Sequence, residues 1–173
     1  MKHFQTNNTC FIAGEELSRL LRLEAALYQH TRDAYWHITG FDLQEVPEFY
    51  NQQFLELAGI IDGMVELLLA LGYPEGYLNG IIRDSASGDS ISVEGSNAYF
   101  RKLIALHEQA LAQLTAIFRM VTESLGPCIN FISGTIDRHK NLLPMLRSGL
   151  KNSVFAVKVE NCHLAESNPM LFV

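Results

Sequence analysis

The chain has 173 residues, of which 48% are hydrophobic, so it is long enough for one domain with a substantial core. Its formal net charge of −6 disfavours nucleic acids and anionic membrane surfaces as general partners. The sequence shows neither a basic start followed by an apolar leader nor an uncharged stretch of membrane-spanning length, so we expect a cytoplasmic protein.

Apolar residues recur at helical spacing from residue 14 to residue 38, and Gly40 stands where a helix would end. This spacing predicts a first helix of about seven turns. A second helix is expected from Pro47 to Leu71, because proline suits a first helical turn and a glycine follows the last apolar residue. Two long helices joined by a short loop should lie antiparallel.

Residues 73–95 are rich in glycine and serine and predict a long connection with one short helix around residues 77–83. A third long helix is expected from Ser96 to Gly126, and a fourth from about Cys128, with Pro144 kinking or ending it. The long middle connection allows the second and third long helices to be parallel. The pattern predicts an all-α, four-helix bundle with one long crossover containing a short helix.

We therefore expect a single domain over residues 1–173, with an N-terminal extension at 1–13 and a C-terminal extension at 151–173.

The second predicted helix carries two acids, Asp62 and Glu66, inside a mostly apolar run from residue 57 to residue 71. They are one helical turn apart, so their charges repel, and apolar surroundings would raise that cost. The fifty residues from 33 to 82 contain eight carboxylates and no lysine or arginine. The pair therefore needs a cation, a proton or a partner chain.

Three sequence strings occur in a recognisable order. They are Tyr35-Trp36-His37-Ile-Thr-Gly at the end of the first helix, Asp62-x-x-x-Glu66 before Leu-Ala-Leu-Gly-Tyr-Pro, and Asp137-Arg-His139 on the last helix. With the small helix in the crossover, they resemble the Dps family of ferritin-like proteins, the mini-ferritins, over roughly residues 15–150. The resemblance implies a hollow homo-oligomer, a dodecamer, that binds and stores iron and protects against oxidative stress.

The resemblance also implies an iron-oxidising site shared across a two-fold interface. In the family, one subunit supplies a first-helix His and a His and an Asp from the start of the second helix, and the other supplies an Asp and a Glu. By position these ligands fall on Tyr35, Pro47 and Asn51, and on Asp62 and Glu66. Only the last two keep the family's ligand. Proline offers no ligand atom, an amide is a weaker ligand than a carboxylate, and a phenol binds iron well only when the metal ionises it.

The resulting candidate metal site consists of Asp62 and Glu66 from one subunit and Tyr35 and Asn51 from the other, an oxygen-rich shell for iron. Trp36 lies beside the metal site in the family and is expected to pack at the interface. The sequence leaves two functions open. One is an iron-storage protein with ferroxidase activity, and the other is a redox-inactive ferritin-like structural or binding protein that keeps only the assembly.

Other polar residues offer alternatives. His30, Asp33 and His37 share one helix face and form either an alternative metal site or a solvated polar face. A di-metal enzyme would need acids on all four inner helix faces, and the third long helix has none on its apolar stripe. We expect Glu24 to make a buried polar contact to the third or fourth long helix, and His107 and His139 to lie at the surface or in salt bridges. The first eighteen residues contain only Lys2 as a base, so DNA binding is not expected.

Overall fold

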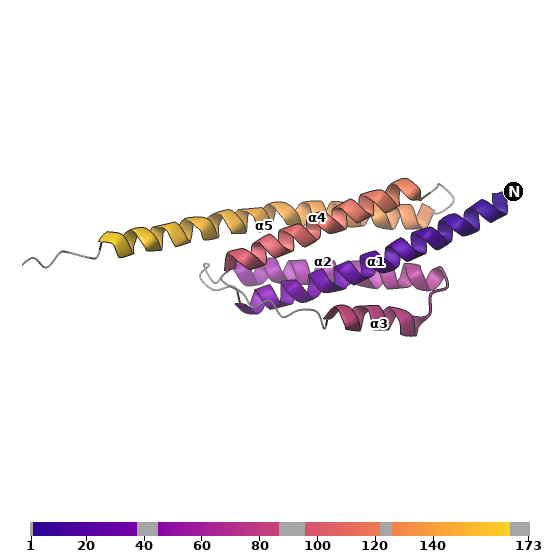
Figure 1. Ribbon diagram of the computed structural model, residues 1–173, viewed down its shortest axis with the longest axis horizontal. Coiled ribbons are helices and arrows are strands. Elements are labelled where there is room, and N and C mark those ends of the chain that lie inside the picture. The colour runs from indigo at the N-terminus through magenta and orange to yellow at the C-terminus, as the bar shows by residue number, and fades with distance from the viewer. Residues whose placement is uncertain (1, 38–44, 87–95, 122–125, 167–173) are drawn as a thin grey trace, which may run out of the picture.

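The computed structural model describes residues 2–37, 45–86, 96–121 and 126–166, with side chains described over 12–36, 49–85, 97–121 and 128–151. Within these residues the chain forms five helices and no strand (Figure 1). The helices are α1 (Lys2–His37), α2 (Glu45–Ala70), α3 (Glu75–Ala86), α4 (Ser96–Met120) and α5 (Gly126–Glu166).

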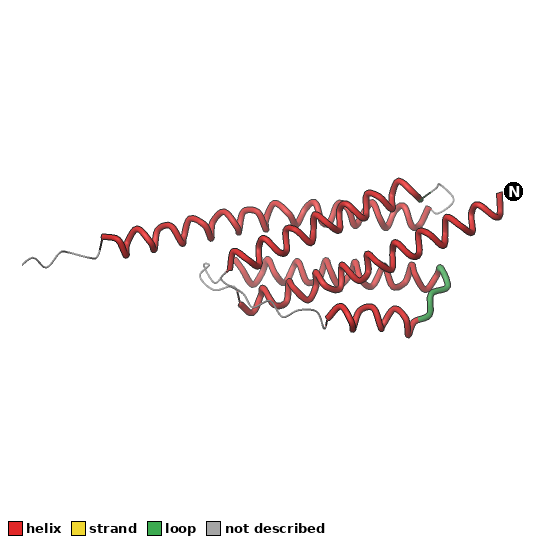
Figure 2. Tube along the Cα trace, viewed as in Figure 1, coloured by secondary structure: helices red, strands yellow, loops and turns green. Residues whose placement is uncertain are grey.

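The four long helices form a bundle. In it α4 packs on α5, and α1 packs on both α2 and α4, while the short α3 lies alongside α1. Figure 2 shows α1 and α2 running in opposite directions, and α2 and α4 in the same direction. A parallel α2 and α4 require a crossover along the length of the bundle, and α3 lies in that crossover. The predicted fold class is therefore confirmed.

The end of α2 follows the predicted stop. Gly72 has a φ of +90°, a conformation that glycine adopts without steric cost. Its N–H donates to the carbonyl of Leu69 at 2.9 Å, and the N–H of Tyr73 donates to the carbonyl of Leu68 at 3.0 Å. These bonds satisfy carbonyls that the end of a helix would otherwise leave unpaired. The chain then turns directly into α3.

Two helices are longer than their periodicity predicts. Residues 2–13, expected as an extension, continue α1, and residues 151–166 continue α5. We expected Pro144 either to kink the fourth long helix or to end it. It does not end the helix, because α5 continues through Pro144 to Glu166. Proline removes one backbone hydrogen bond, but the residues beside it pack into the core and hold the helix: Leu142, Leu143 and Leu146 are buried.

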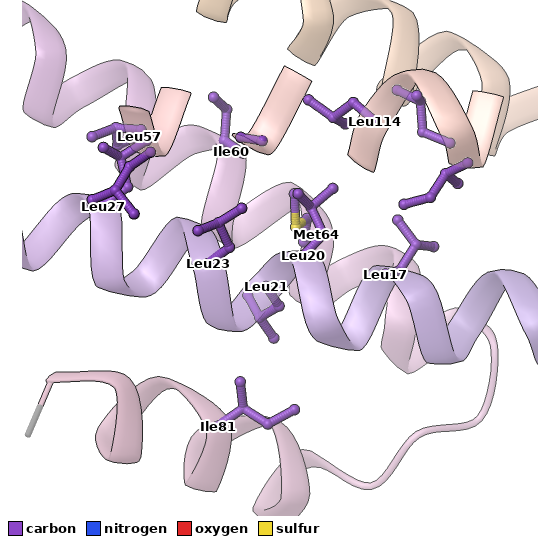
Figure 3. Close-up of a cluster of buried hydrophobic side chains, with 14 of the residues drawn as sticks. Leu17, Leu20, Leu21, Leu23, Leu27, Leu57, Ile60, Met64, Ile81 and Leu114 are labelled. Carbon is purple, nitrogen blue, oxygen red and sulfur yellow. The ribbon is translucent and has the colours of Figure 1, made fainter. Parts of the chain in front are cut away.

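The core is mostly aliphatic, and Figure 3 shows leucine, isoleucine and methionine side chains of it that meet between the helices. Leu20 and Leu27 from α1 and Ile60 and Met64 from α2 are fully buried, as is Leu114 from α4. Their three- and four-residue spacing is the apolar stripe that defined each helix in the sequence. Among the described residues no helix has the length and apolar character needed to cross a membrane.

Candidate functional site

The acid pair on α2 faces away from the core. Asp62 and Glu66 are exposed, whereas Ile60 and Met64, which alternate with them, are fully buried. The apolar run of the sequence therefore divides into a buried stripe and an exposed face. The expectation that the acids lie in apolar surroundings is wrong for the single chain, where water solvates both carboxylates. Within the described residues neither acid forms an ion pair.

The exposed face of α2 also carries large apolar side chains. Leu55 is 76% exposed and Leu69 is 43% exposed, and both share one helix face with Asn51, Asp62 and Glu66. Leu55 and Leu69 lie about 21 Å apart along the helix, so they leave two separate exposed apolar side chains, one on each side of the acids. We call this surface, made of Asn51, Leu55, Asp62, Glu66 and Leu69, the α2 face.

The end of α1 contributes an aromatic cluster. The Tyr35 ring contacts Trp36, Tyr50 and Phe54, with ring centroids 5.4, 6.3 and 6.1 Å apart. Trp36 is 69% exposed, so most of the largest apolar side chain in the sequence faces outward. A pocket of about 210 Å³ opens beside these rings, lined by Tyr28, Arg32, Tyr35, Trp36 and Phe54.

The predicted ligands do not meet within one chain. Tyr35 contacts Tyr50, so it lies near Asn51, the next residue of α2. Asn51 and Asp62 are eleven residues apart on the same helix, which corresponds to about 16 Å of rise. One chain therefore presents two half-sites, an acid pair and an aromatic–amide end. A site with the predicted composition would need a second copy of the chain.

The alternative group on α1 is only partly described, because the side chain of His37 lies outside the described residues. The amide of Gln29 donates to Oδ1 of Asp33 at 3.2 Å. Burial, followed by the nearby Lys102 ammonium, lowers the pKa of His30. A neighbouring cation also disfavours a metal ion at His30. Among the described residues no group of three or more His, Cys, Asp or Glu side chains is arranged to hold a metal ion.

A second set of polar side chains lies inside the bundle. Each long helix contributes one fully buried residue to this set: Glu24 from α1, Gln53 from α2, His107 from α4 and His139 from α5. Gln53 Nε2 lies 2.8 Å from His107 Nε2, and His107 Nδ1 lies 2.8 Å from His139 Nδ1. His139 Nε2 lies 2.9 Å from Glu24 Oε1. We call these four residues the core chain.

The core chain corrects the expectation for His107, which neither lies at the surface nor forms a salt bridge among the described residues. His139 is also fully buried, but it pairs with an acid, as one of its two alternatives predicted. The expected contact from Glu24 to a later helix is confirmed. Each of the four residues occupies a position on its helix's apolar stripe, as His107 does between Leu103 and Ala110. That placement is the signal that would have identified the histidines as internal.

Burial dominates the electrostatics of the core chain. Burial and, to a smaller extent, the neighbouring His139 together lower the pKa of His107 to about 3. His107 is therefore a neutral imidazole at any pH above that value.

The core chain does not suit a metal ion. His139 has Glu24 beside one ring nitrogen and His107 beside the other, and these nitrogens lie on opposite edges of the ring. No single ion can therefore reach three of these donors. The 2.8 Å between the two histidines is a hydrogen-bond distance, whereas the 2.9 Å from His139 Nε2 to Glu24 Oε1 is an ion-pair distance without hydrogen-bond alignment. Neither separation leaves room for an ion.

No protein-family model matches the chain, and no curated protein matches it. Solved structures do match it. It is similar to a Dps protein from Vibrio cholerae O1, described as a member of a broad superfamily of ferritin-like diiron-carboxylate proteins. The TM-score is 0.67 and the identity 20%, over 83% of this chain and 92% of the other.

Two further Dps proteins have a similar fold over a similar share of the chain. One from Bacillus brevis has a TM-score of 0.70 at 15% identity, over 83% of this chain and 97% of the other. One from Thermosynechococcus elongatus has a TM-score of 0.70 at 16% identity, over 84% of this chain and 94% of the other. The fold of this chain is therefore that of the ferritin-like Dps proteins.

Proposed function

We propose that the chain assembles through the α2 face into a Dps-like oligomer and binds iron where the two half-sites of neighbouring copies meet. The observation that carries the proposal is the exposed acid pair, Asp62 and Glu66, on a face that also exposes Leu55 and Leu69. A partner copy would cover these leucines, and paired carboxylates favour a cation. Trp36 would be covered in the same contact.

Iron is the substrate and cargo in this proposal. Two carboxylates from one copy and a phenol and an amide from another make an oxygen-rich shell, which suits hard cations such as Fe(III). With peroxide as oxidant, two Fe(II) ions each lose one electron, and hydrogen peroxide takes up two electrons and two protons to give two water molecules. The protein's contribution is to hold iron at fixed carboxylates that stabilise the higher charge of the product.

Iron oxidation tests this proposal directly. Fe(II) is added anaerobically to the full-length protein, peroxide follows, and the ferric absorbance is recorded. We expect faster oxidation than in a protein-free blank, and a loss of that acceleration in the double variant Asp62→Asn/Glu66→Gln. The matched control, Glu75→Gln/Asp84→Asn on α3, removes the same charge from exposed acids far from the site. Equal rates in both variants, or no acceleration in the wild type, would exclude the ferroxidase function.

A second candidate is favoured by the residues that replace the usual ligands. Tyr35 and Asn51 stand where the resemblance places a His and an Asp. The redox-inactive alternative is an assembly that binds a cation or a partner without oxidising iron. Sedimentation of the full-length protein distinguishes it from a non-assembling chain. Oligomers combined with blank-like iron kinetics would support this second function.

A further inference from the structure

The contacts within the core chain limit how many protons its four residues carry and on which atoms. It contains three contacts in series, Gln53 to His107, His107 to His139, and His139 to Glu24. Two polar atoms 2.8 or 2.9 Å apart need one proton between them, because otherwise their lone pairs repel. A neutral imidazole carries one N–H, so each ring can donate on only one side.

In one arrangement the Gln53 amide donates to His107 Nε2, as the structure has its nitrogen placed. His107 must then carry its proton on Nδ1 and donate it to His139. His139 in turn carries its proton on Nε2, facing Glu24. Every contact then has a proton, but Glu24 is ionised. The four residues of the core chain therefore have a net charge of −1.

In the other arrangement the Gln53 amide is rotated by half a turn and its oxygen accepts from His107. The nitrogen and oxygen of an amide have nearly the same shape, so this rotation changes no packing. His107 then carries its proton on Nε2, and His139 donates from Nδ1. One additional proton occupies the contact between His139 and Glu24, and the core chain is neutral overall.

Charges around the core chain do not compensate for the negative arrangement. The charged residues nearest in sequence to the core chain on α2, α4 and α5 are Glu56, Glu108, Arg138 and Lys140, and Arg147 lies about two turns beyond His139. On the outside of the bundle, Arg138 pairs with Glu56 at 3.5 Å and Arg147 with Glu108 at 2.8 Å. Lys140 is paired with Asp137 on the outside of α5, and Arg22, two residues before Glu24 on α1, is exposed. Tyr50, one turn before Gln53, stays neutral because burial raises its pKa. A buried charge without a counter-charge is strongly unfavourable.

We propose that the centre of the bundle is a proton-binding site: one proton is shared between Glu24 and His139, and Gln53 presents its carbonyl oxygen to His107. The proton takes the place that a metal cation occupies between helices in other bundles. The orientation of Gln53 and the proton count are coupled, because the carbonyl can face His107 only when His107 carries its proton on Nε2.

The proposal has a consequence for stability. Well above pH 6.5, His139 in an unfolded chain carries only the single N–H of neutral imidazole, and Glu24 is ionised. The folded chain keeps one additional proton between these two residues, so it binds one proton more than the unfolded chain. By linkage, the unfolding equilibrium constant should rise about tenfold for each pH unit above that point, until the folded chain releases the proton.

Urea unfolding of the full-length protein between pH 6.5 and 9 tests this, at fixed protein concentration. In Glu24→Gln, a near-isosteric change, the core chain is neutral without the extra proton, and the alkaline slope should be lost. The control Glu108→Gln removes an exposed carboxylate next to His107 in the sequence and should keep the wild-type slope. Identical slopes in wild type and Glu24→Gln would overturn the proposal.

Neutron diffraction of deuterated wild-type crystals at pH 7 tests the same proposal without a variant. We expect a deuteron on Nε2 of His107, one on Nδ1 of His139 and one between His139 and Glu24. A deuteron on Nδ1 of His107, with the Gln53 amide donating, would overturn it. Cobalt(II) added to the protein tests whether the site binds a metal ion in place of the proton. Cobalt absorption bands that appear in the wild type and are absent in Glu24→Gln would overturn the proposal.

Discussion

His107 Nδ1 and His139 Nδ1 lie 2.8 Å apart, so two buried imidazoles from α4 and α5 share a single proton across the helix interface. The pair lies in the middle of a bundle whose remaining inner positions are almost entirely apolar. A polar contact of this kind has a direction, and it favours one alignment of α4 against α5 over others.

The first prediction concerns acid stability. The pKa of His107 is about 3 in the folded chain and 6.5 in a solvated one, so the unfolded chain binds one more proton between these values. Stability from this group is therefore complete above about pH 6.5 and falls as the pH drops toward 3, by about tenfold in the unfolding constant per pH unit. Chemical unfolding at pH 6.5, 5.5 and 4.5 measures this. His107→Gln should have a shallower acid slope, and an unchanged slope would contradict the assignment.

The second prediction concerns packing between α2 and α5. A Cβ atom at Gly63 would lie 2.5 Å from Cε2 of Phe131. Gly63→Ala should therefore destabilise the chain by about 1–3 kcal/mol, as overpacking usually does. Urea unfolding measures the loss. The control is Gly134→Ala on α5, where nothing lies within 4 Å of the added atom, and which should be neutral or slightly stabilising.

Adding Phe131→Leu to Gly63→Ala should recover part of the lost stability, because it removes the ring that the new methyl group meets. If Gly63→Ala and Gly134→Ala behave alike, the close approach of α2 to Phe131 is not present in solution.

The third prediction concerns assembly. Leu55 is 76% exposed on the α2 face, and a charge there would have to be desolvated in an interface. Leu55→Asp should shift the protein from oligomer to smaller species in sedimentation velocity while leaving its helical content unchanged. Tyr77→Asp, at an exposed aromatic residue on α3, is the matched control and should leave the sedimentation profile as in the wild type. Dissociation by the control alone would place the interface on α3.

The fourth prediction is a gain of activity. Tyr35→His/Asn51→Asp restores two ligand types that the resemblance places at these positions. If the half-sites meet as proposed, the double variant should oxidise Fe(II) several-fold faster than the wild type, because imidazole and carboxylate bind Fe(II) better than a neutral phenol and an amide. The ferric absorbance measures the rate. The gain should vanish when Asp62→Asn is added, and a gain that survives this change would arise elsewhere.

Much of the fold follows from local patterns. The three- and four-residue spacing of Leu17, Leu20 and Leu21 requires a helix with one buried stripe, and Gly72 and Pro74 require a stop. The long crossover then makes α2 and α4 parallel. The far ends of α1 and α5 could not be predicted in this way, because residues 2–13 and 151–166 lack a clear apolar period.

The candidate site was only half predictable. The i,i+4 spacing of Asp62 and Glu66 places them on one helix face in any helical structure. Whether that face points inward or outward depends on which residues the neighbouring helices cover. Ile60, Met64 and Leu68 are covered by the bundle, and the acids are left outside.

The number and order of the helices, and the presence of an acid pair, follow from residues close together along the chain. The exposure of the acids, and the meeting of Glu24, Gln53, His107 and His139 at the centre of the bundle, depend on how the helices pack. These residues lie 54 positions (Gln53 and His107), 32 positions (His107 and His139) and 115 positions (Glu24 and His139) from their partners in the chain. Their contact arises from the packing of four helices, which no local pattern specifies.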